Sequence, residues 1–143
     1  MTWDDGLLEL KDGADNVDGN EGVPNLAEEW QSKDLHIWVV RAEDVVYAPV
    51  NCEFGSRRVK GEVKHTNLTG GTPAYVAGEV LLAGPSQLVV NGWSGRYPVR
   101  SQEAMIGVAV AFKNSGYDVW STGWDADARK GVPFGTIPPR RVA

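Results

Sequence analysis

One stretch of this chain has a clear helical pattern, and the segments around it are short and strand-like. Ser101 is a suitable N-cap, and Glu103 places a negative charge in the first helical turn. Met105, Ala109 and Phe112 recur at helical spacing and form one apolar face. The sequence Asn-Ser-Gly at 114–116 is typical of a helix end. A chain with one principal helix and several strands is expected to pack that helix on a sheet.

The strand-like segments are short and rich in branched and aromatic residues. Residues 84–86 (Gly-Pro-Ser) are typical of a three-residue hairpin turn. Such a turn pairs Leu81 with Val89 and Glu79 with Asn91. The expected strands are residues 35–40, 45–48, 62–66, 75–83, 87–91 and 117–122, with a turn at 41–44 and a loop at 67–74. The predicted fold class is α+β: a mainly antiparallel, curved sheet with one principal helix packed on it.

The 143 residues fit one domain with unequal charge along its length. Residues 1–34 hold ten acidic side chains and two lysines, a net charge of −8, whereas the remainder carries +3. We therefore expect an acidic, partly mobile arm over 1–34, an α+β domain over 35–125 and an extended tail over 126–143. A short helix over 26–31 is expected within the arm. The arm could meet a basic protein partner, as a toxin antagonist would.

Composition excludes several classes of function. The mildly basic body lacks the strong basic footprint of a general nucleic-acid binder. No apolar run approaches the ~18 residues of a membrane span, and the N-terminus has no secretory-signal pattern. With Cys52 as the only cysteine, we expect a cytoplasmic protein. Two histidines and one cysteine make a zinc site improbable, so no metal is expected.

Polar side chains concentrate in three segments that the predicted hairpin brings together. Glu79 is expected on an apolar sheet face, where an unpaired charge would be costly. Arg96, Lys64 and His65 are the candidate partners, and such a cluster should shift pKa values. The candidate catalytic residues are His65, Glu79 and Tyr97, and the candidate ligand-binding residues are Lys64, Thr66, Asn91, Ser94 and Arg96.

Each of these side chains also has a plain structural interpretation. His65 could be a hydrogen-bonding group at a strand end. Glu79 could serve only to pair with Arg96, and Tyr97 could be part of the core. The glycines at 92 and 95 could be turn residues. The segment 92–96 (Gly-Trp-Ser-Gly-Arg) lacks the second glycine of a nucleophile elbow, which argues against a hydrolase serine.

Three spaced motifs then indicate a family. They are Lys-His-Thr-x-Leu-x-Gly-Gly at 64–71, Ala-Gly-Glu at 77–79 and Asn-x-x-Ser-Gly-x-Tyr-Pro at 91–98. This pattern resembles the Ser-His-Glu domain of bacterial polymorphic toxins and Makes-caterpillars-floppy toxins, and a similar run in plant IQ-motif calmodulin-binding proteins. The resemblance covers roughly residues 60–116. Thr66 stands where the family has serine, and Arg96 where it has a second histidine, which adds a fixed positive charge suited to phosphate or carboxylate.

The resemblance implies a small toxin- or effector-like domain whose pocket takes a nucleotide or another anionic small molecule. ADP-ribosyl transfer is one such chemistry, with NAD as the candidate cofactor. His65 would hold the ribose, Tyr97 would stack on nicotinamide and Glu79 would stabilise the oxocarbenium-like centre. The usual transferase order places glutamate last, an order that Glu103 would restore. The alternatives are a non-catalytic ligand- or protein-binding module and an interaction protein that uses its acidic arm.

Overall fold

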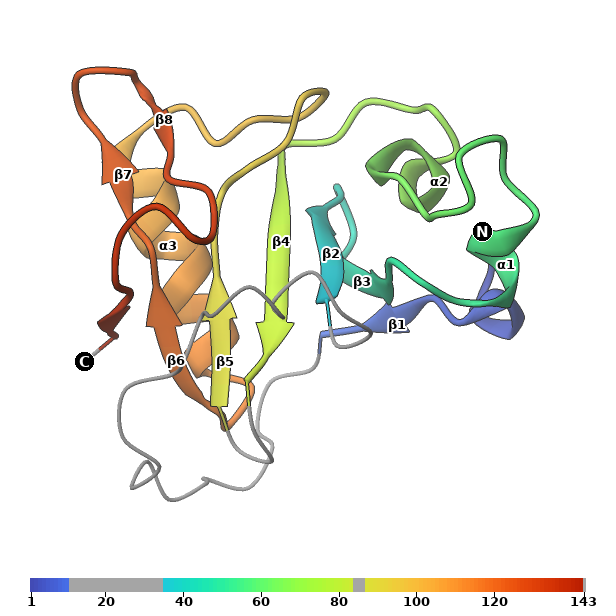
Figure 1. The fold of residues 1–143 in the computed structure, drawn as a ribbon, viewed down its shortest axis with the longest axis horizontal. Coiled ribbons are helices and arrows are strands. Elements are labelled where there is room, and N and C mark those ends of the chain that lie inside the picture. Colours follow the sequence, from blue (N-terminus) through green and yellow to red (C-terminus); the bar gives the residue numbers. More distant parts are fainter. Residues whose placement is uncertain (11–34, 84–86, 143) are drawn as a thin grey trace.

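The computed structural model describes residues 1–10, 35–83 and 87–142, which form a seven-stranded sheet with helices on both faces (Figure 1). A short 3-10 turn (Trp3–Asp5) precedes the first strand. The strands are β1 (Leu8–Glu9), β2 (Leu35–Val40), β3 (Val45–Pro49), β4 (Val76–Leu82), β5 (Gln87–Val90), β6 (Asp118–Ser121), β7 (Trp124–Asp125), β8 (Lys130–Gly131) and β9 (Arg140–Arg141). The helices are α1 (Glu53–Ser56), α2 (His65–Thr69) and α3 (Gln102–Lys113).

The sheet is mainly antiparallel, and the predicted α+β class is confirmed. Its strand order is β1-β3-β2-β4-β5-β6-β9, while β7 and β8 form a separate two-stranded sheet. Only β5 and β6 pair in parallel within the described residues. Parallel neighbours need a crossover connection, and α3 provides it. The single long helix therefore explains the one departure from antiparallel pairing.

The hairpin register predicted from the sequence is confirmed. Leu81 pairs with Val89. Beyond the paired residues, the Asn91 N–H donates to the Glu79 carbonyl at 3.0 Å. The turn residues 84–86 lie outside the described part of the chain. This register fixes Glu79 beside Asn91, on the sheet face that also carries Leu81 and Val89.

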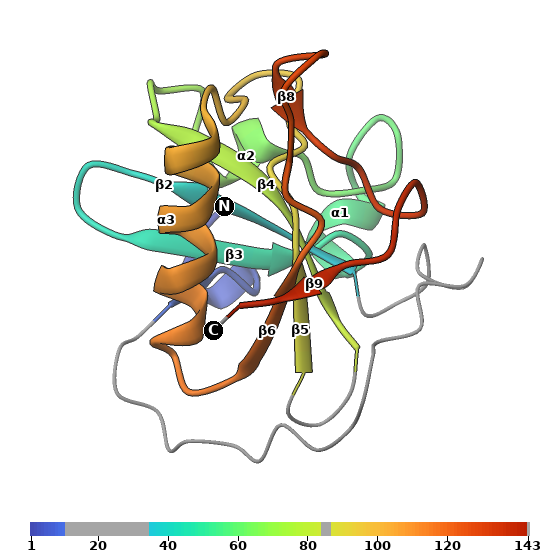
Figure 2. The ribbon, with the colours of Figure 1, turned by 90° about the vertical axis from the view of Figure 1, so that its left-hand side faces the viewer.

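Helix α3 covers one face of the sheet as its sequence pattern predicts (Figure 2). The Ser101 hydroxyl accepts a hydrogen bond from the Ala104 N–H at 3.0 Å, which caps the helix. Met105, Ala109 and Phe112 are each 2% exposed. The Phe112 ring meets the fully buried Trp38 ring edge-on, with centroids 5.8 Å apart. This face is a continuous apolar layer.

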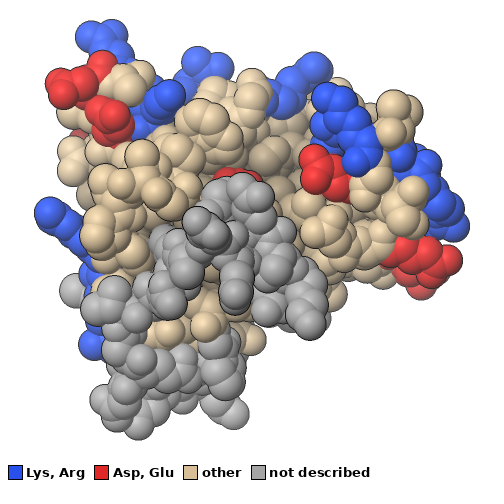
Figure 3. All heavy atoms as spheres, viewed as in Figure 1, with Lys and Arg blue, Asp and Glu red and all other residues tan. Residues whose placement is uncertain are grey.

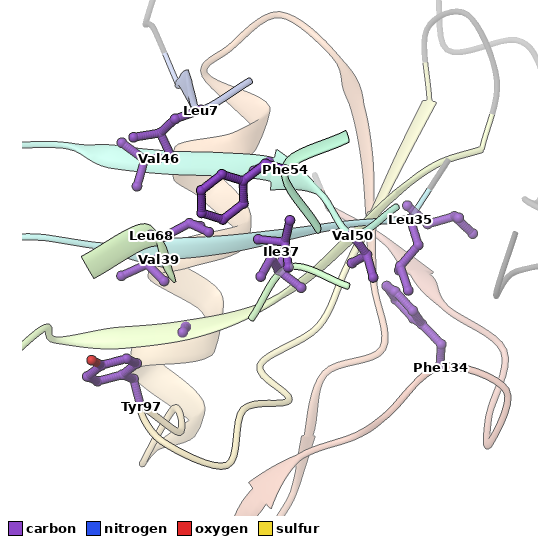
Figure 4. Close-up of a cluster of buried hydrophobic side chains, with 14 of the residues drawn as sticks. Leu7, Leu35, Ile37, Val39, Val46, Val50, Phe54, Leu68, Tyr97 and Phe134 are labelled. Carbon is purple, nitrogen blue, oxygen red and sulfur yellow. The ribbon is translucent and has the colours of Figure 1, made fainter. Parts of the chain in front are cut away.

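The opposite face is covered in smaller pieces (Figure 4). Phe54 from α1 and Leu68 from α2 pack against the strand residues Val39 and Val46. The chain ends contribute as well, because Leu7 and Phe134 are both about 4% exposed in the same cluster. Two helices of four and five residues cannot cover a whole sheet face.

Residues 62–66 were expected to form a strand. Residues 62–64 instead lead into helix α2, which begins at His65. The Asn67 side chain accepts a hydrogen bond from the Lys64 N–H at 2.8 Å, which satisfies one of the backbone donors before the first turn. Gly70 ends the helix in the left-handed region, with φ 66°. The expected loop at 67–74 accordingly starts inside α2. The hydrogen bond to Asn67 favours a helix at this position, although the composition of the segment is strand-like.

Both ends of the described chain join the sheet. Leu8 and Glu9 pair with β3, so part of the expected arm is a sheet strand. The expected extended tail supplies β8 and β9, and β9 pairs with β6. Most of the acidic arm, including the helix expected over 26–31, lies outside the described residues. The domain thus extends beyond the 35–125 boundaries expected from composition.

Candidate functional site

A pocket of about 420 Å³ opens on the face that α1 and α2 cover. Its wall comes from strands β2 and β4, from the linker before α2 and from the loop after β5. The lining residues are Leu35, Ile37, Val50, Glu62, Val63, Lys64, His65, Thr66, Glu79, Gly95 and Arg96. The three motif segments therefore do converge on one hollow, whose wall holds both aliphatic and charged side chains.

His65 joins the three motif segments through both of its ring nitrogens. Its Nε2 lies 2.8 Å from the carbonyl oxygen of Gly78, and its Nδ1 lies 3.3 Å from the Ser94 hydroxyl. A carbonyl only accepts, so Nε2 carries the hydrogen and Nδ1 accepts from Ser94. Burial lowers the pKa of His65 below its ordinary value, against the opposing effect of the Gly78 hydrogen bond. Burial thus favours the neutral ring, with its hydrogen on Nε2.

Ser94 is an anchor of its own loop. Its hydroxyl oxygen accepts from the Tyr97 N–H at 3.1 Å while the hydroxyl faces His65. Ser94 does not line the pocket, although its neighbours Gly95 and Arg96 do. The structure therefore brings Ser94 to His65 but places it behind the pocket wall.

Glu79 lies in the pocket with a neutral partner where the sequence analysis expected a cation. Asn91 Nδ2 donates to Glu79 Oε1 at 3.0 Å, and no described basic side chain forms a salt bridge with this carboxylate. Burial raises the pKa of Glu79, the nearby Glu62 raises it further, and the Asn91 hydrogen bond opposes both. The Asn91 amide stabilises the buried carboxylate but carries no charge that would neutralise it. The pKa of Glu79 therefore remains above its ordinary value.

Asn91 is a structural residue of the site. It is 0% exposed and does not line the pocket. Its Oδ1 accepts from the backbone N–H groups of Glu79 and Trp93 at 2.9 and 3.0 Å. From the other face of the sheet, Trp38 Nε1 donates to the carbonyls of both Glu79 and Asn91. The Glu79 carboxylate is thereby held in position by a buried network.

Lys64, Thr66 and Arg96 line the pocket as the sequence analysis expected of ligand-binding residues. Lys64 and Arg96 are exposed, and neither forms a salt bridge with another described residue. In Figure 3, basic side chains gather over α1, α2 and the connection between them. That connection, residues 57–64, carries four basic side chains against one acidic side chain. The connection before α2 is therefore locally basic in a chain with a net charge of −5, while the pocket lining itself holds two cations, Lys64 and Arg96, and two acidic side chains, Glu62 and Glu79.

Tyr97 lies behind the pocket and is part of the core. It is 7% exposed, and its hydroxyl donates to the Thr72 carbonyl and meets the Thr69 hydroxyl, both at 2.9 Å. Its ring is therefore not on the wall where stacking on a nicotinamide would need it. Figure 4 shows the ring at the end of the apolar cluster, near the edge of β4. Glu103, the alternative transferase glutamate, lies in the exposed first turn of α3, outside the pocket lining.

Sequence reasoning missed two contributors to the site. Glu62 lines the pocket and raises the pKa of Glu79. Its position two residues before the first motif was the available signal. Gly131 of β8 packs its backbone against Gly92, so close that a Cβ at Gly131 would lie 2.9 Å from Gly92 backbone atoms. Lys130 Nζ lies 4.9 Å from the centre of the Trp93 ring. Nothing in the local sequence indicates this long-range support.

Within residues 1–10, 35–83 and 87–142, no cluster of three or more histidine, cysteine, aspartate or glutamate side chains could hold a metal ion. None of the helices described there combines the length and apolarity of a membrane span. Comparisons of the chain with protein-family models, curated proteins and solved structures find no match. The site must therefore be interpreted from its own geometry.

Proposed function

We propose that the pocket binds a nucleotide or another anionic small molecule. Lys64 and Arg96 hold the anionic group at the rim, and the Thr66 hydroxyl adds a neutral hydrogen bond. The observation that carries this proposal is the separation of charges in the pocket. Glu79 is satisfied by Asn91, so both cations are left without an ion pair among the described residues. Arg96 lies over the Tyr97 ring at 5.9 Å, but neither cation has a carboxylate partner in the described part of the chain. Two cations without an ion pair beside a partly apolar hollow favour an anionic ligand with an organic body.

Glu79 is the proposed acid–base group. Its raised pKa favours proton uptake, and Oε2 has no hydrogen bond to another described residue. It would accept or donate a proton at the ligand, or stabilise a developing positive charge such as that of a ribosyl centre. His65 is the proposed positioning group, because both of its nitrogens are engaged. The three spaced motifs support a toxin- or effector-like role, and the lone Cys52 supports a cytoplasmic location.

The proposal is tested by calorimetric titration with AMP, NAD and ribose 5-phosphate. The double variant Lys64→Gln/Arg96→Gln should weaken binding of a phosphate-bearing ligand by about tenfold or more. A matched double variant, Arg100→Gln/Lys113→Gln, removes two exposed cations that do not line the pocket and should bind as the wild type does. Equal binding by the two double variants, or no binding of any of these ligands to the wild type, would contradict the proposal.

The second candidate function is ligand binding without turnover. It is favoured by the engagement of both His65 nitrogens and by the burial of Tyr97. Glu79→Gln separates the two functions, because glutamine keeps the shape of the side chain and cannot accept a proton. Under the catalytic proposal this variant retains binding and loses NAD or nucleotide turnover measured by chromatography. Under the second, the wild type binds these ligands and converts none of them.

A further inference from the structure

A second hollow, of about 470 Å³, lies on the other side of the sheet between α3 and the C-terminal segment. Ile106 borders it from the helix, Ile137 and Arg140 border it from the segment that leads into β9, and Trp124 of β7 completes the wall. Its size is that of a site for a small organic molecule. We name it the α3–β9 groove. It shares no lining residue with the pocket of the proposed function.

Exposed apolar side chains of this groove are one reason to assign it a ligand. Ile106 is 56% exposed and Ile137 is 48% exposed, although they belong to elements 24 or more residues apart in sequence. A single exposed isoleucine is ordinary, but two that border one hollow form a concave apolar surface. Val110, one turn along α3 from Ile106, is also exposed but does not line the groove. The exposed apolar surface of α3 therefore continues beyond the groove, but of these two residues only Ile106 faces the hollow.

The charge of the groove defines the other half of the ligand. Two arginines line it, and no acidic side chain does within the described chain. Arg141 Nε donates to the buried Asp118 at 2.8 Å, so this arginine is partly neutralised and fixed in place. Arg140 is exposed and forms no salt bridge with a described residue. The net charge offered to a ligand is thus positive, and Arg140 carries it.

From this apolar wall and its arginine we infer that the α3–β9 groove binds a small amphipathic organic anion, with an aromatic or aliphatic body and one carboxylate or similar group. The body packs against Ile106, Ile137 and Trp124, and the anionic group pairs with the Arg140 guanidinium. The ligand therefore binds in one orientation, with its anionic group toward β9. This inference is independent of the pocket that holds Glu79.

The test uses 1-naphthoate as the probe and isothermal titration calorimetry on the full chain. Binding is expected with a Kd on the order of 0.1 mM, a strength reached by ligands with about a dozen heavy atoms. Acetate lacks the apolar body, and 1-naphthylmethylammonium carries the opposite charge, so both should bind at least tenfold more weakly. Quenching of tryptophan fluorescence should accompany binding, because Trp124 lies in the wall.

Two variants and their matched controls locate the probe. Arg140→Glu should weaken 1-naphthoate binding about tenfold or more, and Ile106→Gln about fivefold. Arg100→Glu and Val110→Gln alter an exposed arginine and an exposed apolar residue of α3 outside the groove, and should leave binding unchanged. All four positions are exposed, and circular dichroism would confirm that each variant folds.

Three outcomes would overturn the inference. The first is equal binding by Arg140→Glu and Arg100→Glu. The second is equal affinity of the wild type for the cationic and anionic naphthalene probes, which would show that Arg140 selects nothing. The third is a wild-type dimer that Ile106→Gln dissociates, which sedimentation velocity would detect and which would assign the groove to a second copy of the chain.

Discussion

The two faces of the sheet are covered in different ways, and their chemistry differs accordingly. On one face, the twelve-residue helix α3 lies over an apolar layer that includes Trp38 and Phe112. The other face is covered by α1, α2 and several loops together, and His65 and Glu79 line a pocket there. A long amphipathic helix excludes water from the strands beneath it and leaves a hollow only at its side, whereas short pieces leave room for partly solvated polar groups above the strands. The candidate site lies on the face that is covered in pieces.

The largest expected effect is a loss of stability when a buried side chain is removed from the core between α3 and the sheet. Phe112→Ala removes a 2%-exposed ring that meets Trp38, and it should lower the free energy of unfolding by about 3–5 kcal/mol. Urea denaturation followed by circular dichroism measures this loss. Val110→Ala, on the exposed side of the same helix, should change stability by less than about 0.5 kcal/mol. Similar losses for both variants would show that α3 does not seal this face.

The next effect tests the residue at which the two faces meet. A Cβ at Gly78 would collide with the Asn91 carbonyl oxygen and with the Trp38 ring. Gly78→Ala should therefore lower the free energy of unfolding by about 1–3 kcal/mol or more. Gly107→Ala is the control, because a Cβ there meets nothing within 4 Å in the exposed part of α3. That variant should gain about 0.5–1 kcal/mol, and thermal unfolding of the pair would reveal the opposite signs.

A smaller effect is expected where Ser94 meets His65 on the pocket face. Ser94→Ala removes the hydroxyl that donates to His65 Nδ1 and accepts from Tyr97 N, at a cost of about 1 kcal/mol. Because the lost donor stabilises the neutral ring, the pKa of His65 should rise in the variant. NMR titration of His65 in the wild type and in the variant measures this change. An unchanged pKa of His65 would mean that Ser94 does not hold the ring neutral.

The smallest expected effect depends on pH and concerns Glu79. Its pKa is higher in the folded protein than the ordinary 4.5, so the unfolded chain releases this proton first. As pH rises from 4.5 through the raised value, the wild type should lose stability relative to Glu79→Gln, and the difference should then level off. The loss is limited because the Asn91 hydrogen bond opposes the effect of burial. Urea midpoints across pH 4–8 give the curve, and a flat difference would contradict the assignment.

Features that depend on local sequence patterns could be predicted, whereas features that depend on long-range contacts could not. The hairpin pairing of Leu81 with Val89 and the apolar face of α3 are local patterns, and both are confirmed. The partner of Glu79 was predicted on electrostatic grounds as a cation. It is Asn91, because backbone pairing already places that amide opposite the carboxylate. A buried amide is electrically neutral, so no charge pattern in the sequence could indicate it.

The second wrong prediction concerns the short helix α2. Residues 62–66 have strand-like composition, yet α2 begins at His65, with a hydrogen bond to Asn67 at its start and a left-handed Gly70 at its end. This difference matters for the site, because α2 turns His65 toward Gly78 and Ser94. The sequence analysis did foresee that the three motifs meet. It did not foresee that Ser94, Asn91 and Tyr97 would support the wall while Lys64, Thr66 and Arg96 form it.

The backbone contact between Gly92 and Gly131 has a consequence for how this protein tolerates change. A side chain at position 131 would lie about 2.9 Å from backbone atoms of Gly92, so β8 or the loop that carries Arg96 would have to shift to accept it. One steric contact thus joins two positions almost forty residues apart, although neither lines the pocket. A residue in the last quarter of the chain therefore restricts the backbone of a loop that belongs to the candidate site.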